Sequence, residues 1–502
     1  MKRVWPLAVA PVAFLLYFFG YPLVRIISMT IGGWREALAI PGLDRVFAFT
    51  FGQAVLSTFL TLLVGLPVTA AFSRHLVPGR RWMEAVLSMP FVLPTVVVGA
   101  AFVALGFKGS FWGIVLAHVF YNVSVVIRIV GPTWTQLGHA LEEAAATLGA
   151  GPVKRFRHIM LPLLAPSLGA TASLVFLFTF TSFGVVVILG GLELATVEVA
   201  IWREATGMFR LGAAAALALV QLVLVSGVLY LFARIQRKRA VALPVTVLPP
   251  SKPPSALAWI WLTFGLVASM TPILLLVVGS LRVQGRWSAA AWLNSSTDLA
   301  VATGNSLLFA TVATVVAVII GGLSAWFIAK QTSGVGTLID VLVMLPLGTS
   351  AVTIGLGMLV ALDRPVDLRG SWLLVPLAHS LVAIPFVMRI LVPSLRAIGG
   401  DLGDAAAVLG ASPRRVWREV ELPLVRRALG AAAAFAAAIS IGEFGATAFL
   451  VRPASTTLPA LVFRSLSRPG PLNLAAALAA ASVLLVLVGG VVTMADPRRQ
   501  KL

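Results

Sequence analysis

The chain of 502 residues contains no cysteine, and this absence limits the chemistry it can perform. It cannot build a disulfide framework, bind a metal through sulfur or use a thiol nucleophile. The sequence also lacks the phosphate loop G-x-x-x-x-G-K-[ST], so we expect no nucleotide-hydrolysing domain in this chain. It has no H-E-x-x-H or G-x-S-x-G motif and only five histidines, a pattern that argues against a hydrolase.

Charged residues are scarce as well, at 11% of the chain, whereas 59% of the residues are hydrophobic and the mean hydropathy is +0.99. A water-soluble fold of this length does not have such a composition. Apolar runs of about 20 residues are long enough to cross a bilayer as helices. They predict an all-α polytopic membrane protein of about twelve spans, near 7–30, 49–73, 84–106, 111–131, 168–190, 212–234, 257–281, 301–329, 338–362, 371–392, 428–451 and 474–494.

The net charge of +20 is distributed unevenly between the predicted loops. If the N-terminus is cytoplasmic, most of the excess Lys and Arg falls on the cytoplasmic side, as the positive-inside rule requires. We therefore expect both termini in the cytoplasm and read the charge as a topology signal, not as a nucleic-acid surface. The first run follows Lys2-Arg3 and is too long for a signal peptide, so we expect it to be retained as a span.

The sequence repeats itself after 261 positions. Glu143-Ala-Ala-Ala-Thr-Leu-Gly149 returns as Asp404-Ala-Ala-Ala-Val-Leu-Gly410, and Ile159-Met-Leu-Pro162 returns as Val420-Glu-Leu-Pro423. This period predicts a duplicated membrane domain. We divide the chain into a first half (1–234), a cytoplasmic linker rich in Pro and Arg (235–256) and a second half (257–502).

Each repeated loop, 142–162 and 403–423, is predicted to be a helix-turn-helix on the cytoplasmic face. An alanine-rich helix ends at Gly149 or Gly410, and Pro152 or Pro413 then suits the first turn of a second helix. We expect the Leu-Pro pair that follows to redirect the chain into the next span. An amphipathic hairpin lying on lipid headgroups is the alternative reading.

The pattern E-A-A, three residues, G, about nine residues, then I-x-L-P resembles the EAA loop of permease subunits in binding-protein-dependent ATP-binding-cassette importers. Two copies in one chain are similar to fused permeases with the type I importer fold. In that family the loop docks in a groove of the ATPase and couples its closure to the membrane gate. The resemblance assigns this role to Glu143, Ala144, Ala145, Gly149, Leu161 and Pro162, and to Asp404, Ala405, Ala406, Gly410, Leu422 and Pro423.

The resemblance also implies the partners and the location. They are two copies of a cytoplasmic ATPase, an extracytoplasmic solute-binding protein and membrane lipid, in a prokaryotic plasma membrane. ATP and magnesium would be used by the ATPase, and this chain would bind no cofactor or metal and catalyse no reaction. Asp404 and Val420 depart from the pattern conservatively.

The fifth and eleventh spans line the translocation path in the family, which points to Ser182, Phe183, Glu443 and Phe444. A carboxyl group inside a span is costly unless it faces a wet cavity or a partner. Glu443 therefore either lines the path and favours a cation or is satisfied by neighbouring Ser or Thr. His118 and His379 occupy equivalent positions, and we expect them to make hydrogen bonds within the fold rather than to bind a metal or carry protons.

Among fused permeases the chain most resembles thiamine importers, through strings such as Ala195-Thr-Val-Glu-Val-Ala-Ile-Trp202 and Ser440-Ile-Gly-Glu-Phe-Gly445. Ferric-iron and polyamine importers share the architecture and remain alternatives. An ion-driven secondary transporter would also show duplicated halves but would not explain the paired loops. A membrane-embedded enzyme would need a set of catalytic residues that the spans do not contain.

Overall fold

The computed structural model describes the whole chain except residues 1–4, 138–139, 192, 240–252, 332–333, 365–366, 399–400 and 495–502. Most of the predicted linker lies outside the described residues. Within the described part, ten helices are long and apolar enough to span a membrane, and two bent helix pairs bring the number to twelve if each is one span. The predicted all-α fold of about twelve spans is confirmed on that count.

The chain forms two compact units, which are described separately. Unit 1 comprises residues 1–40, 200–222 and 280–502, and unit 2 comprises residues 41–199 and 223–279. The helices of unit 2 are α3 (Leu43–Arg74), α4 (Arg80–Val92), α5 (Thr95–Ala104), α6 (Phe111–Gln136), α7 (Ala140–Thr147), α8 (Pro152–Arg155), η2 (Phe156–Met160), α9 (Leu161–Phe180), α10 (Gly184–Leu189) and α13 (Ala256–Ser280). Helices α11 (Val197–Trp202) and α12 (Leu211–Arg239) have residues in both units, and so does α13 through its last residue, Ser280.

Unit 1 begins with α1 (Trp5–Leu15), η1 (Leu16–Gly20) and α2 (Tyr21–Leu38), and it includes η3 (Arg203–Gly207). Its C-terminal part contains β1 (Arg282–Val283), β2 (Arg286–Trp287), α14 (Ala290–Asn294), α15 (Ser296–Lys330), α16 (Gly334–Met344), η4 (Leu345–Gly348), α17 (Ala351–Ala361), α18 (Leu374–Ala397), α19 (Asp401–Val408), α20 (Pro413–Val416), η5 (Trp417–Glu421), α21 (Leu422–Gly442), α22 (Thr447–Leu450), η6 (Pro453–Ser455), α23 (Leu458–Leu466) and α24 (Pro471–Met494). The two short strands pair as an antiparallel hairpin, with Arg282 opposite Trp287.

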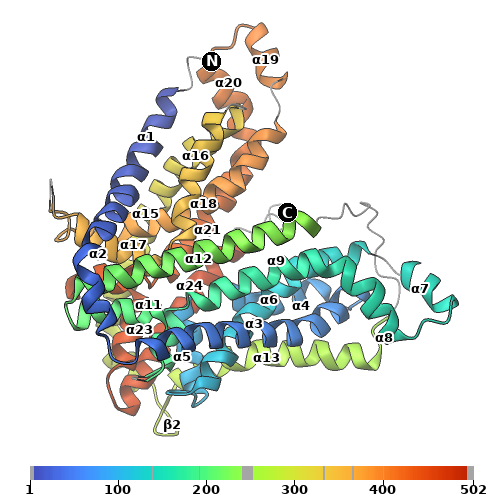
Figure 1. Cartoon of the computed structure of the whole chain (residues 1–502), viewed down its shortest axis with the longest axis horizontal. Coiled ribbons are helices and arrows are strands. Elements are labelled where there is room, and N and C mark those ends of the chain that lie inside the picture. The colour runs from blue at the N-terminus through green and yellow to red at the C-terminus, as the bar shows by residue number, and fades with distance from the viewer. Residues whose placement is uncertain are drawn as a thin grey trace. The chain divides into compact units, whose positions relative to one another are not determined.

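The same three-helix packing occurs in both units (Figure 1). In unit 2, α3, α6 and α9 contact one another, and in unit 1 their repeat equivalents α15, α18 and α21 do the same. The first helix of each half packs in the other half's unit. Helices α1 and α2 contact α15 and α17 in unit 1, and α13 belongs to unit 2. The first helices of each sequence half therefore pack against helices of the other half.

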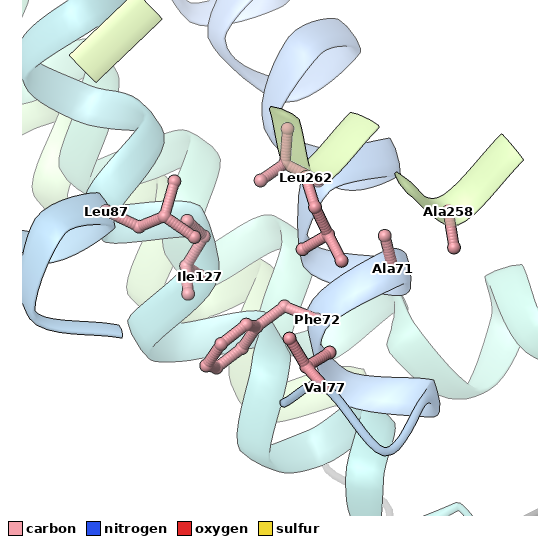
Figure 2. Close-up of a cluster of buried hydrophobic side chains, with 8 residues drawn as sticks. Ala71, Phe72, Val77, Leu87, Ile127, Ala258 and Leu262 are labelled. Carbon is pink, nitrogen blue, oxygen red and sulfur yellow. The ribbon is translucent and has the colours of Figure 1, made fainter. Parts of the chain in front are cut away.

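Helix α13 is held in unit 2 by a cluster of buried apolar side chains (Figure 2). Ala258 and Leu262 of α13 meet Phe72 of α3, Leu87 of α4 and Ile127 of α6. Because lipid tails are as apolar as these side chains, the association depends on close packing more than on a hydrophobic driving force. The contact thus requires complementary shapes from four helices.

Two predicted spans are bent in the structure. The third span divides into α4 and α5 at an angle of 100°, and the ninth divides into the helix Gly334–Gly348 and α17 at 98°. Prolines stand at both breaks: Pro94 precedes α5, and Pro346 lies in η4. A proline cannot donate the helical hydrogen bond and clashes with the preceding turn, so each of these two spans is divided into two helices near its proline.

Candidate functional site

The first loop segment (residues 140–162) is a helix, a glycine turn and a second helix. Helix α7 ends in a Schellman arrangement, in which the Gly149 N–H donates to Ala146 and the Ala150 N–H donates to Ala145. Gly149 has φ +81°, a left-handed conformation that a residue with a Cβ adopts only at a cost. Pro152 then occupies the first turn of α8, where its missing N–H is harmless.

The second loop segment (residues 401–423) repeats this geometry. Gly410 has φ +82° and donates to Ala407, and the Ala411 N–H donates to Ala406. Helix α20 begins at Pro413. The predicted helix-turn-helix is therefore present in both halves, with the same backbone hydrogen bonds.

The second helix of each loop segment enters the membrane span without interruption. A π-helical turn, η2 or η5, connects α8 to α9 and α20 to α21, so the span expected to begin near 168 is part of a helix running from Pro152 to Phe180. The Leu161 N–H bonds Phe156 and the Leu422 N–H bonds Trp417, each one residue before a proline. The widened turn absorbs the proline, so the predicted change of direction at Leu-Pro is wrong.

Large apolar side chains project from both loop segments. Leu148 and Leu409, next to the glycine turns, are each 88% exposed, and Val153 and Val408 are also exposed. Isolated apolar residues on a surface are ordinary, but Leu148 and Leu409 are an equivalent pair at the two repeated turns, which chance exposure does not explain. They give each loop segment an uncovered apolar tip.

The predicted loop residues lie on this same surface. Glu143, Ala144, Gly149, Leu161 and Pro162 are exposed, as are Ala405, Gly410 and Pro423, whereas Ala145, Ala406 and Leu422 are half-buried. Asp404 lies in α19, but its side chain is outside the described part of the structure. The residues that the sequence pattern singles out are thus gathered on one helix-turn-helix in each half.

The predicted path residues lie where the fifth and eleventh spans break. Helix α9 ends at Phe180 and α10 begins at Gly184, while α21 ends at Gly442 and α22 begins at Thr447. Ser182, Phe183, Glu443 and Phe444 fall in these breaks, and all four are buried.

The two breaks are held by equivalent histidines. In unit 2, His118 contacts Ser182 Oγ through Nε2 at 2.8 Å and lies 3.4 Å from Ser57 Oγ through Nδ1. In unit 1, His379 contacts Ser440 Oγ and Thr447 Oγ1, both at 2.8 Å. The expectation that these histidines make hydrogen bonds within the fold is confirmed.

Glu443 is the repeat equivalent of Ser182 and caps the following short helix. Its carboxylate accepts the backbone N–H of Ala446 at 3.1 Å and that of Thr447 at 3.2 Å, and it lies 3.3 Å from His379 Nε2. The Thr447 hydroxyl is within hydrogen-bonding distance as well. The carboxylate therefore has the partners that a structural role requires, and its role in a translocation path stays a prediction.

Comparison with known proteins identifies the class of this membrane chain. The family of binding-protein-dependent transport system inner membrane components matches residues 62–241, a stretch that includes the whole first loop segment. The Thiamine transport system permease protein ThiP of Salmonella typhimurium is 27% identical over 461 residues, which cover 87% of this chain and 86% of that protein. The chain is a permease component of a binding-protein-dependent transport system.

Other permeases show how far the similarity extends. ThiP of Brucella suis is 28% identical over 518 residues and covers 96% of this chain and 93% of its own length. The Sulfate transport system permease protein CysT of Salmonella typhimurium is 30% identical over 184 residues, covering 34% of this chain and 66% of its own. The similarity to the thiamine permeases thus includes both halves of this permease, whereas the sulfate permease matches about a third of it.

Proposed function

We propose that the permease imports a small cation, with thiamine as the first candidate, from an external solute-binding protein to the cytoplasm. The observation that carries the importer role is the pair of loop segments with identical turn geometry and exposed apolar tips. Thiamine is favoured because relatives named for it are similar over nearly the whole chain. Ferric-iron and polyamine importers remain alternative substrate classes.

Each loop segment would dock on one copy of a cytoplasmic ATPase, so one permease would engage two copies. The apolar tip around Leu148 or Leu409 would enter a groove of the ATPase, and the glycine turn would let its backbone approach closely. Both termini would then be cytoplasmic. ATP and magnesium would be bound by the ATPase, and this chain would supply no catalytic group.

Transport would proceed by alternating access. A loaded binding protein can shift the permease toward its outward-facing state only to the extent that it binds that state more tightly. Closure of the two ATPases on ATP would displace both loop segments, and each segment would carry the displacement directly into α9 or α21, because helix and span are continuous. The continuity through the π-helical turn is what makes this transfer mechanically direct.

ATP hydrolysis by the reconstituted assembly tests the substrate. The permease, its ATPase and its binding protein are placed in liposomes, and hydrolysis and uptake are compared with thiamine, ferric iron and spermidine. Stimulation by thiamine alone would support the proposal, and stimulation by another ligand would replace the substrate. Uptake that needs an ion gradient and not ATP would instead indicate a secondary transporter.

Docking is tested by capture of the ATPase on the tagged permease. Leu148→Asp and Leu409→Asp put a charge on the exposed tips and should each reduce capture, and the double variant should abolish it. Leu293→Asp is the matched control, because Leu293 is also a largely exposed leucine but lies on α14, after the hairpin. Full capture by the double variant would refute docking through the tips.

A further inference from the structure

The helices α3 and α15 occupy equivalent places in the two halves, and each ends with a basic residue next to a loop segment. These residues are Arg74 at the end of α3 and Lys330 at the end of α15. Each forms an ion pair with a glutamate of the loop segment in its own unit: Arg74 with Glu142, and Lys330 with Glu421. The two glutamates do not occupy equivalent positions.

In the second half the glutamate of the ion pair is buried, whereas the side chain of its partner Lys330 is 36% exposed. Glu421 is buried in η5, its Oε1 lies 2.5 Å from Lys330 Nζ, and its Oε2 accepts the indole N–H of Trp326 at 3.1 Å. The rings of Trp326 and Trp417 meet edge to face at 6.1 Å. Both carboxylate oxygens are therefore satisfied by side chains of α15, so the second helix of the loop segment is fixed to α15.

The equivalent place in the first half is apolar. Met160 stands where the repeat has Glu421, and it packs in a cluster with Val126, Val130 and Trp134. There the ion pair is made one helix earlier, by Glu142 on α7, before the glycine turn. The first loop segment is thus tied to α3 through its first helix, and the second is tied to α15 through its second helix.

We propose that Glu421 is a positioning residue that ties the second loop segment to α15, so that displacement of this segment by the ATPase moves α15 together with α21. The proposal rests on the proposed function. In the first half the equivalent contact around Met160 is apolar. The ion pair of that half, Arg74 with Glu142, lies before the glycine turn instead of after it. The two loop segments therefore transmit the same ATPase closure through different contacts.

The physical basis is the difference between an apolar contact and an ion pair whose carboxylate is buried. An apolar contact can rearrange without leaving a charge unpaired, whereas separating Glu421 from Lys330 and Trp326 would leave a buried carboxylate without partners. The segment and α15 consequently move as one body. Removing the charge should leave the segment able to move without carrying α15 with it.

The test measures uptake per ATP hydrolysed by the full assembly in liposomes, together with the apparent unfolding temperature of each permease variant. Glu421→Gln and Lys330→Met break the ion pair, and Lys330→Arg keeps it. Allosteric coupling energies correspond to about 5- to 150-fold changes, so we expect the first two variants to lose about tenfold in uptake per ATP. Lys330→Arg should stay near the wild-type ratio.

A double variant separates positioning from stability. Lys330→Met/Glu421→Met replaces the ion pair by an apolar contact like that of Met160, so the unfolding temperature should return toward wild type while uptake per ATP stays low. Asp298→Asn is the control, since it breaks an exposed ion pair with Arg464 in the same unit.

Two results would overturn the proposal. One is wild-type uptake per ATP in Glu421→Gln. The other is full recovery of both stability and uptake in the double variant, which would show that the ion pair serves folding alone. If the wild-type assembly shows no ATP-driven uptake at all, the proposed function is wrong and this proposal fails with it.

Discussion

Two glycines allow α2 and α12 to approach closely within unit 1, and they give a sharp test of the packing. A Cβ placed on Gly33 would lie 2.1 Å from the carbonyl oxygen of Gly212 and 2.4 Å from its carbonyl carbon. The neighbouring Gly32 faces open space, with no atom within 4 Å of a Cβ placed there. Gly33→Ala and Gly32→Ala therefore add the same methyl group to adjacent positions of one helix, with opposite expected effects.

The expected magnitude follows from the overlap. Non-bonded carbon atoms prefer separations of about 3.5–4 Å, so the alanine at position 33 would push the two helices apart by more than about 1 Å. Overpacking of this kind typically costs about 1–3 kcal/mol. The same shift would loosen the adjacent contacts of Ala37 with Ala213 and Ala216. Gly32→Ala has no overlap and should gain up to about 1 kcal/mol of helix propensity.

Thermal unfolding of the full chain in detergent compares the two variants with wild type. The 13 tryptophans provide an intrinsic fluorescence signal. We expect Gly33→Ala to unfold at a lower temperature than wild type and Gly32→Ala at the same or a higher temperature. Equal unfolding temperatures for the two variants would refute the close approach of α2 and α12.

Four further predictions follow from other parts of the chain. Replacing Gly149 by Leu should cost about 1–2 kcal/mol of left-handed strain at the turn and reduce ATP-driven uptake while the chain still inserts, as membrane fractionation and uptake assays can show. Glu443→Ala should lower the unfolding temperature, because loss of a helix cap costs about 0.5–2 kcal/mol, and Glu443→Gln should lower it less. Since the chain has no cysteine, Gln284→Cys should react with a membrane-impermeant thiol reagent from outside only if the predicted topology holds. Met160→Glu should destabilise the first half, because the carboxylate would enter an apolar cluster, and a wild-type unfolding temperature would contradict this.

Much of the loop geometry could be predicted from the sequence, because local rules determine it. Glycine at a left-handed position and proline at the first turn of a helix act within a few residues, so Gly149, Gly410 and Pro152 reveal the turn without knowledge of the surrounding fold. Hydropathy likewise predicts the spans, since crossing a bilayer requires only length and apolar composition.

Hydropathy could not predict the direction of the spans or their partners. It counts apolar residues along the chain and therefore treats α4 and α5 as one straight helix, although Pro94 stands at the bend. The packing of α13 in unit 2 depends on matching the shapes of side chains from four helices that are distant in sequence. No periodicity within α13 itself contains that information.

Glu421 shows what a repeat comparison could have revealed. It occupies the variable position between Val420 and Leu422, so a motif search passes over it. The available signal combined one difference with one shared feature: a glutamate where the first half has Met160, and a basic residue, Arg74 or Lys330, that ends the helix before the bent span in both halves. A buried charge needs a partner, so a charge that appears in only one of two repeats directs attention to the residue that neutralises it.

The same logic connects the loop segment with the helix break. Both positions discussed in the second half exchange a neutral residue for a glutamate, Ser182 for Glu443 and Met160 for Glu421. In each case the structure supplies new partners: Thr447 and two backbone N–H groups around Glu443, and Lys330 with Trp326 around Glu421. The backbone repeat is retained, while the buried electrostatics of the halves differ. A permease with such halves has two similar loop segments for its ATPases but two different internal linkages behind them, so equal substitutions in the two halves need not have equal effects.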